Sequence, residues 1–146
     1  MRIVLGVIWA FVLFLFTCSF HMWELFFSRE LHFVMTKSPD FSDLFRTSDF
    51  DLKDSEWLVR KIGHLLGFFI LALILTNFGK LRAGLYLSIG YAVFTEIIQL
   101  YFLRGGRIYD MLIDTAGVLL AYGICRLIRT TSIEPARNTR YNSTRR

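Results

Sequence analysis

A group of polar and ionisable residues interrupts the apolar second half of this chain. Glu96 and Gln99 stand three positions apart near the end of one apolar run, and Asp110 and Asp114 stand four apart at the start of the next. Side chains at these spacings share one face of a helix, where carboxylates can act as general acids, general bases or cation ligands. Basic residues complete the group, in an earlier segment and between the two runs: Lys61, His64, Arg104 and Arg107.

Each residue type in this group suggests a chemical role. A guanidinium binds phosphate and carboxylate groups through paired hydrogen bonds, so Arg104 and Arg107 are candidate anion-binding residues. Glu96, assisted by His64, is a candidate general base or acid, and Asp114 is a further catalytic candidate. The remaining candidate ligand-binding residues are Lys61, Gln99 and Asp110.

Some of these side chains are also metal ligands in other proteins. His64, Glu96, Asp110 and Asp114 offer one nitrogen and several oxygens, which suit a divalent cation. The sequence lacks the paired His or Cys spacings typical of metal sites, so we expect no metal and no other cofactor. It also lacks a nucleophilic triad, a phosphate-binding glycine loop and a dinucleotide fingerprint, and so it indicates no common soluble enzyme class.

The segments that carry these residues have the composition of membrane spans. The chain has 146 residues, of which 54% are hydrophobic and 16% aromatic, and the apolar residues lie in long runs. Four runs are long enough to cross a hydrocarbon core about 30 Å thick: residues 3–20, 62–78, 83–103 and 111–128. The sequence therefore predicts an all-α, four-helix transmembrane bundle in a single domain, with an outer connection at 21–61 and a tail at 129–146.

The distribution of Lys and Arg predicts the orientation. Five arginines follow the fourth run, and Lys80 and Arg82 occupy the turn between the second and third, whereas the 21–61 connection holds more acids than bases. Basic residues stay on the cytoplasmic side, so we expect both termini inside and the polar group in the outer leaflet. The net charge of +5 lies mostly in the tail, where it indicates contact with anionic lipid and not with nucleic acid.

Several small residues lie where helices could approach each other closely. Ser88, Ala92, Gly117 and Ala121 share helix faces with the polar group, and Gly63-x-x-x-Gly67 lies at the start of the second run. Small residues let helices approach closely in lipid, and each unpaired charge inside a span costs about 2.5–3.5 kcal/mol. We therefore expect these faces to form the interior of the bundle, with three carboxylates opposite the three cations Lys61, Arg104 and Arg107.

The acidic stretch at 40–56 within the outer connection has two interpretations. It contains apolar residues at intervals, so it could form a short helix that covers the polar group as a lid. The favoured interpretation is a solvated loop.

The ordered set of polar residues resembles the VanZ-like membrane proteins of bacteria. The resemblance covers about residues 55–125 and rests on three elements: Lys61-x-x-His64, Glu96-x-x-Gln99 and Arg107-x-x-Asp110-x-x-x-Asp114-x-x-Gly117. It implies a multi-pass protein of the bacterial plasma membrane. The family is named for an accessory protein of teicoplanin resistance and has no established reaction.

Three functions remain open at this stage. In the first, the polar group forms a pocket that binds or modifies an outer-leaflet lipid or cell-wall component and thereby influences glycopeptide susceptibility. In the second, it is a non-enzymatic structural network that holds the helices together. In the third, Glu96, His64 and Asp114 relay ions or protons, although spans three and four offer no ionisable residue between them and Arg126. The sequence does not specify an oligomeric state.

Overall fold

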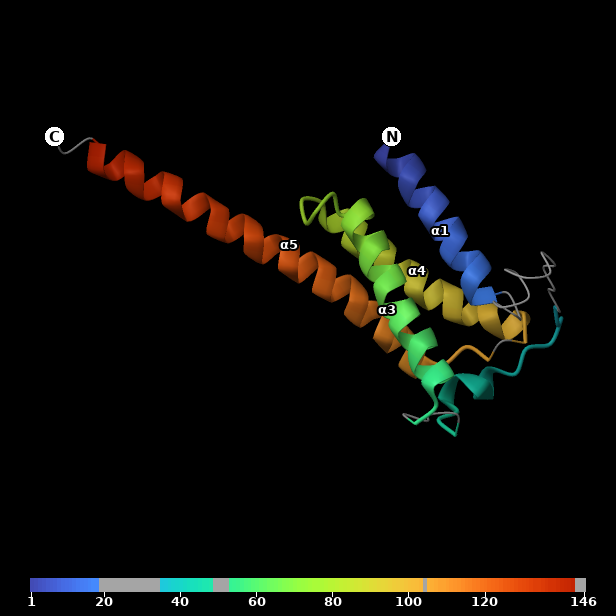
Figure 1. Cartoon of the computed structure of the whole chain (residues 1–146). Helices are drawn as coiled ribbons and strands as arrows, with labels where there is room; N and C mark the ends of the chain where they lie inside the picture. The colour runs from blue at the N-terminus through green and yellow to red at the C-terminus, as the bar shows by residue number, and fades with distance from the viewer. Residues whose placement is uncertain (19–34, 49–52, 104, 144–146) are drawn as a thin grey trace.

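The computed structural model describes residues 1–18, 35–48, 53–103 and 105–143, with side chains described as far as residue 131. This part of the chain is all-α, as the sequence predicted. Its elements are α1 (Arg2–Cys18), the short 3-10 helix η1 (Phe41–Phe45), α3 (Ser55–Leu75), α4 (Arg82–Tyr101) and α5 (Ile108–Ser143). Helices α3, α4 and α5 pack against one another, and α1 contacts α3 and α4 (Figure 1).

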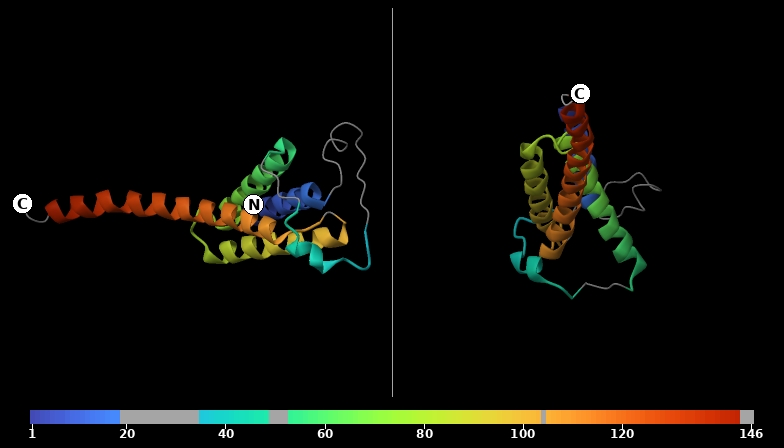
Figure 2. Two further views of the ribbon diagram at one scale, coloured as in Figure 1. Left: turned by 90° about the horizontal axis from the view of Figure 1, so that it is seen from below. Right: turned by 90° about the vertical axis from the view of Figure 1, so that its left-hand side faces the viewer.

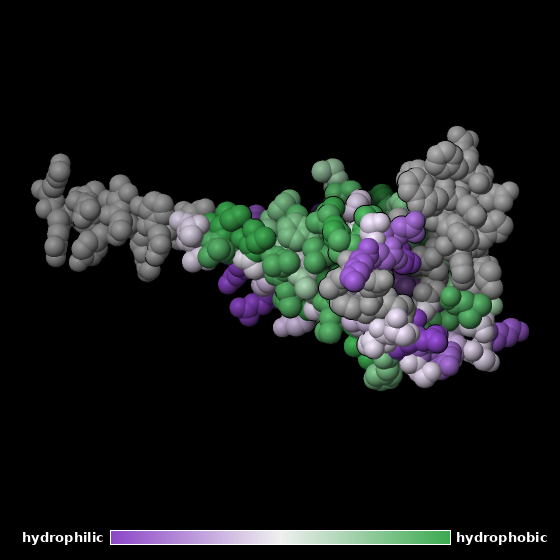
Figure 3. Space-filling model, turned by 60° about the horizontal axis from the view of Figure 1, so that its bottom comes forward, coloured by the Kyte–Doolittle hydropathy of each residue, from purple (hydrophilic) through white to green (hydrophobic). Residues whose placement is uncertain are grey.

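Three of the helices are long and apolar enough to cross a membrane: α3, α4 and the Ile108–Thr131 part of α5. Helix α1 is also apolar but has 17 described residues, which span about 26 Å at 1.5 Å per residue. Hydrophobic residues cover much of the surface of the bundle in Figure 3. Ile3 and Leu112, which are 70% and 65% exposed, belong to this surface and suit contact with lipid.

The helices begin earlier than the hydrophobic runs suggest. Helix α3 starts at Ser55 and not at residue 62, because the Asp54 side chain accepts a hydrogen bond from the Glu56 N–H at 2.9 Å and caps the helix. Lys61 and His64 consequently lie inside α3, about 1.7 and 2.5 turns after its start. At the other end of the chain α5 continues to Ser143, so most of the expected tail is helical and extends beyond the bundle (Figure 2).

The buried faces of α3, α4 and α5 meet in an apolar core. Phe68, Leu71, Ala92, Val118 and Ala121 are fully buried there. Ser88 is also buried, so the expected stripe of small residues does line the interior. The polar residues of α3, α4 and α5 continue these faces toward one end of the core.

Two glycines lie at close helix contacts, and a third does not contribute. Gly117 of α5 packs against the backbone carbonyl of Leu65, where a Cβ has no room, and Gly67 packs against the end of the Leu13 side chain of α1, which a Cβ would displace. Gly63 has no neighbour within 4 Å and is exposed. The expected Gly63-x-x-x-Gly67 contact is therefore wrong in its first member.

The α3–α4 turn closes the end of the bundle that lies away from the polar residues. Buried Thr76 donates to the Ala72 carbonyl at 2.6 Å and accepts from the Gly79 N–H at 3.1 Å. Gly79 has a φ of 75° and lies against Cys125 of α5, where a side chain would not fit. The N-terminus and the C-terminus also point toward this end (Figure 1).

Candidate functional site

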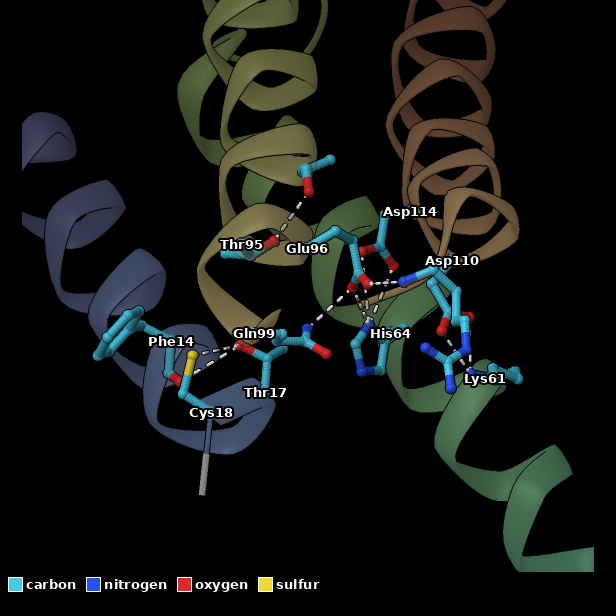
Figure 4. Close-up of polar contacts among 12 residues, drawn as sticks. Phe14, Thr17, Cys18, Lys61, His64, Thr95, Glu96, Gln99, Asp110 and Asp114 are labelled. Atoms are coloured by element: carbon cyan, nitrogen blue, oxygen red, sulfur yellow. Dashed lines mark hydrogen bonds and ion pairs between the residues drawn. The ribbon is translucent and has the colours of Figure 1, made fainter. Parts of the chain in front are cut away.

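The polar residues of three helices come together at one end of the core. Lys61 and His64 project from α3, Glu96 and Gln99 from α4, and Asp110 and Asp114 from α5 (Figure 4). Arg107 immediately precedes α5 and contacts the same group. We call these seven residues the polar cluster. The eighth candidate, Arg104, lies outside the described residues.

Two carboxylates and one imidazole form the most buried part of the polar cluster. Glu96 and Asp114 are 0% exposed. The Nδ1 atom of His64 lies 3.3 and 3.4 Å from the two oxygens of Asp114 and 4.0 Å from Oε1 of Glu96. The Nδ1 atom of His64 thus faces both carboxylates, while the other ring nitrogen points away from them (Figure 4).

Glu96 also fixes the start of α5. Its Oε2 accepts a hydrogen bond from the backbone N–H of Arg107 at 3.0 Å, and its Oε1 accepts one from the Gln99 amide at 2.9 Å. The first N–H groups of a helix have no partner within that helix, and a carboxylate there is favoured by the helix dipole. Gly106 makes the approach possible, because a Cβ at this position would collide with the Glu96 carbonyl.

Lys61 and Asp110 form an ion pair between α3 and α5. The ammonium group lies 2.7 Å from both carboxylate oxygens. It also lies 5.4 Å from the centre of the Trp57 ring and 5.0 Å from that of Tyr109, distances at which cation–π attraction contributes. This pair is thus held by electrostatic contacts on several sides.

Arg107 connects the polar cluster to η1. Its Nη1 donates to the Asp43 carbonyl at 2.9 Å, and the Thr36 N–H donates to the Tyr101 carbonyl at 2.8 Å. Asp40 caps η1: the Ser42 hydroxyl and backbone N–H donate to this exposed carboxylate, which lowers the pKa of Asp40. Helix η1 therefore contacts the bundle through the Asp43 carbonyl but has no buried residue, so the lid interpretation stays a prediction. Residues 49–52 lie outside the described part.

A cavity of about 360 Å³ borders the polar cluster. Its lining combines five of the seven cluster residues with residues that the sequence did not single out. It is formed by Thr17, Asp54, Trp57, Arg60, Lys61, His64, Gln99, Gly105, Arg107, Tyr109 and Asp110. One available signal was Trp57, which stands four residues before Lys61 and so shares its helix face. Thr17 carried no such signal, since it lies at the end of a separate apolar helix.

Comparison with known proteins gives two matches. A family model described as VanZ/LLP1 matches residues 3–129. The uncharacterized membrane protein YwnJ of Bacillus subtilis (strain 168) is 36% identical over 118 residues, which cover 80% of this chain and 84% of YwnJ. No solved structure shows a significant match.

Proposed function

The chain belongs to the VanZ/LLP1 family of membrane proteins, and we propose that the cavity beside its polar cluster binds the anionic headgroup of a lipid or cell-wall component. The observation that carries this proposal is the basic wall of the cavity at one end of an apolar bundle. A volume of about 360 Å³ falls within the range of small-molecule sites.

The charges of the lining support an anionic ligand. Arg60, Lys61 and Arg107 line the cavity together with the imidazole of His64, against the two carboxylates of Asp54 and Asp110. Arg60 is exposed, so it can reach a ligand without breaking a buried contact. Guanidinium groups hold phosphates and carboxylates by charge-assisted hydrogen bonds.

The charges at the opposite end of the bundle support an outward-facing cavity. Lys80 and Arg82 lie at the end of the α3–α4 turn. Arg126 and Arg129 come soon after Cys125, the α5 residue that this turn contacts. Basic residues mark the cytoplasmic side of membrane proteins. In this topology both termini are cytoplasmic, and the cavity lies at the level of the outer-leaflet headgroups.

Chemical modification of the bound component is part of the same proposal. His64 lines the cavity, and its Nδ1 faces the two buried acids, so its other ring nitrogen is the candidate proton donor or acceptor toward a bound component. Glu96 and Asp114 in this role orient the imidazole.

Binding of a phosphomonoester lipid tests the proposal directly. The purified protein is titrated with short-chain phosphatidic acid in detergent containing EDTA, with phosphatidylcholine as the uncharged comparison. We expect Arg60→Gln and Arg107→Gln each to weaken binding about 10-fold or more, because a hydrogen bond to a charged group contributes about 1.5–3 kcal/mol. A soluble wall peptide with a free carboxylate, titrated in the same way, distinguishes a wall source from a lipid source.

Arg82→Gln is the matched control. It removes the same charge from the other end of the bundle and should leave binding unchanged. Equal losses in the Arg60, Arg107 and Arg82 variants would mean that the protein attracts anionic lipid only through its overall charge. Failure of the wild-type protein to bind either ligand would reject the pocket.

Teicoplanin susceptibility separates this function from a purely structural network. Glu96→Gln and Arg107→Ala are introduced separately into a strain that lacks the native gene. Normal membrane abundance with altered susceptibility supports a binding or catalytic site. Reduced abundance supports the structural alternative, in which the Lys61–Asp110 pair and the Glu96 cap serve only to join the helices. Unchanged abundance and susceptibility in both variants would show that the polar cluster has no role in teicoplanin susceptibility.

A further inference from the structure

The buried side of the polar cluster has the donor groups of a metal site. His64, Glu96 and Asp114 come from three different helices, and one ligating atom from each lies within 4.8 Å of the other two. The sequence showed these residues 32 and 18 positions apart, and only the packing of α3, α4 and α5 brings them together. We propose that they bind one divalent transition-metal ion, of which Zn²⁺ and Mn²⁺ are the test cases.

The charge balance at this point favours a cation. Glu96 and Asp114 are both fully buried, and the ammonium of Lys61 contacts the two oxygens of a third carboxylate, Asp110. Buried carboxylates are costly unless they are paired or bind a metal. A divalent ion with a neutral imidazole balances the two inner carboxylates, whereas a singly protonated His64 balances one.

Asp114 supplies a second, independent observation. The Nδ1 atom of His64 carries at most one proton and lies 3.3 and 3.4 Å from the two oxygens of Asp114, so it can donate to only one of them. Oδ1 of Asp114 is buried, and its nearest donor among the described residues is the His64 Nδ1, an ion-pair contact at 3.3 Å without hydrogen-bond geometry. A metal ion between the two residues would satisfy this oxygen and the imidazole nitrogen together.

The distances suit a small divalent ion. Metal–ligand bonds of about 2.0–2.2 Å in a tetrahedral zinc site place the ligand atoms about 3.4 Å apart. The His64–Asp114 distance of 3.3 Å already meets this value, and the 4.0 Å from His64 to Glu96 requires a small side-chain rotation. One imidazole nitrogen with carboxylate oxygens favours Zn²⁺ or Mn²⁺, since Ca²⁺ and Mg²⁺ prefer oxygen ligands alone.

Glu96 is also held in the way that ligating carboxylates are held. The Gln99 amide and the Arg107 N–H donate to its two oxygens. Such outer hydrogen bonds orient a ligand, and their loss commonly lowers metal affinity about 10–100-fold. We expect a loss of this size for Gln99→Leu, which marks Gln99 as a positioning residue.

Metal binding is measured on the full-length protein in detergent, without added lipid. The protein is stripped with EDTA, separated from the chelator and titrated with Zn²⁺ alone and with Mn²⁺ alone, and bound metal is quantified by mass spectrometry. We expect one ion per chain. We also expect this ion to be lost in His64→Gln, Glu96→Gln and Asp114→Asn, and retained in Glu56→Gln, which removes an exposed carboxylate of α3 outside the polar cluster.

Three results would overturn the proposal. They are a wild-type protein that binds neither ion, an ion that persists in all three ligand variants, and a Glu56→Gln loss as complete as that of Asp114→Asn. If the variants fold poorly, pulsed electron paramagnetic resonance of Mn²⁺ in the wild-type protein decides, because a histidine ligand gives nitrogen coupling and its absence excludes His64. The headgroup titration contains EDTA and the metal titration contains no lipid, so failure of one proposal is distinguishable from failure of the other.

Discussion

The acidic residues of the polar cluster differ in their partners. Asp110 contacts a permanent cation, the ammonium of Lys61, whereas Glu96 and Asp114 share one imidazole. Residue spacing in the sequence was enough to predict which of these side chains share a helix face. It could not predict the partners of Arg107, because the Asp43 carbonyl that Arg107 binds lies 64 positions away, on the short helix η1.

The Lys61–Asp110 pair predicts a strong non-additive effect on stability. Lys61→Met leaves the Asp110 carboxylate buried without its cation, and breaking a buried pair in this way costs about 3–5 kcal/mol. The double variant Lys61→Met/Asp110→Asn removes both charges and should recover most of that loss. Denaturant unfolding of the purified proteins in detergent measures both. Additive losses in the double variant would show that the two residues stabilise the protein independently.

The helices were predictable as apolar runs, but their starting points were not. Run length located α3, α4 and α5, since a membrane span needs a minimum number of apolar residues. The polar first turns of α3 lie outside any apolar run, and the Asp54 cap, which begins this helix, became clear only from its hydrogen bond to Glu56. Which glycines lie at helix contacts likewise became clear only from the packing of the helices.

Two glycines of α5 form a matched test of that packing. Gly117→Ala should destabilise the protein by about 1–3 kcal/mol, because the added methyl group would meet the Leu65 carbonyl and push α3 away from α5. Gly123→Ala on the same helix has open space around it and should be neutral or stabilise by up to about 1 kcal/mol. Thermal unfolding in detergent compares the two, and equal effects would contradict the close contact.

At the scale of the whole molecule, the described chain has a polar end and a turn end separated by an apolar core. The two termini point toward the turn end, so the chain leaves the bundle on the side where it entered (Figure 1). Composition alone indicated this arrangement, because long apolar runs and basic turns are properties of the sequence. The cavity was not predictable, since it depends on how α1, α3 and the α4–α5 connection pack together.

Fusion reporters test which end faces the cytoplasm. Alkaline phosphatase, which is active only outside the cytoplasm, should be inactive after Arg146 and active when inserted after Ser48 near η1, because basic residues stay inside. A fluorescent protein that folds in the cytoplasm should give the opposite pattern at the same two positions. Phosphatase activity after Arg146 would place the polar cluster on the cytoplasmic side and reject an outer-leaflet ligand.

The hydrogen bond from the Arg107 N–H to Glu96 has a consequence for how this protein can be observed. An amide proton exchanges with deuterated solvent only when its hydrogen bond opens. Because this amide is bonded to a side chain that we place at the functional site, its exchange rate reports how firmly the Glu96 carboxylate is held. Deuterium exchange at this single backbone position thereby reports occupancy at the site without any change to the amino-acid sequence.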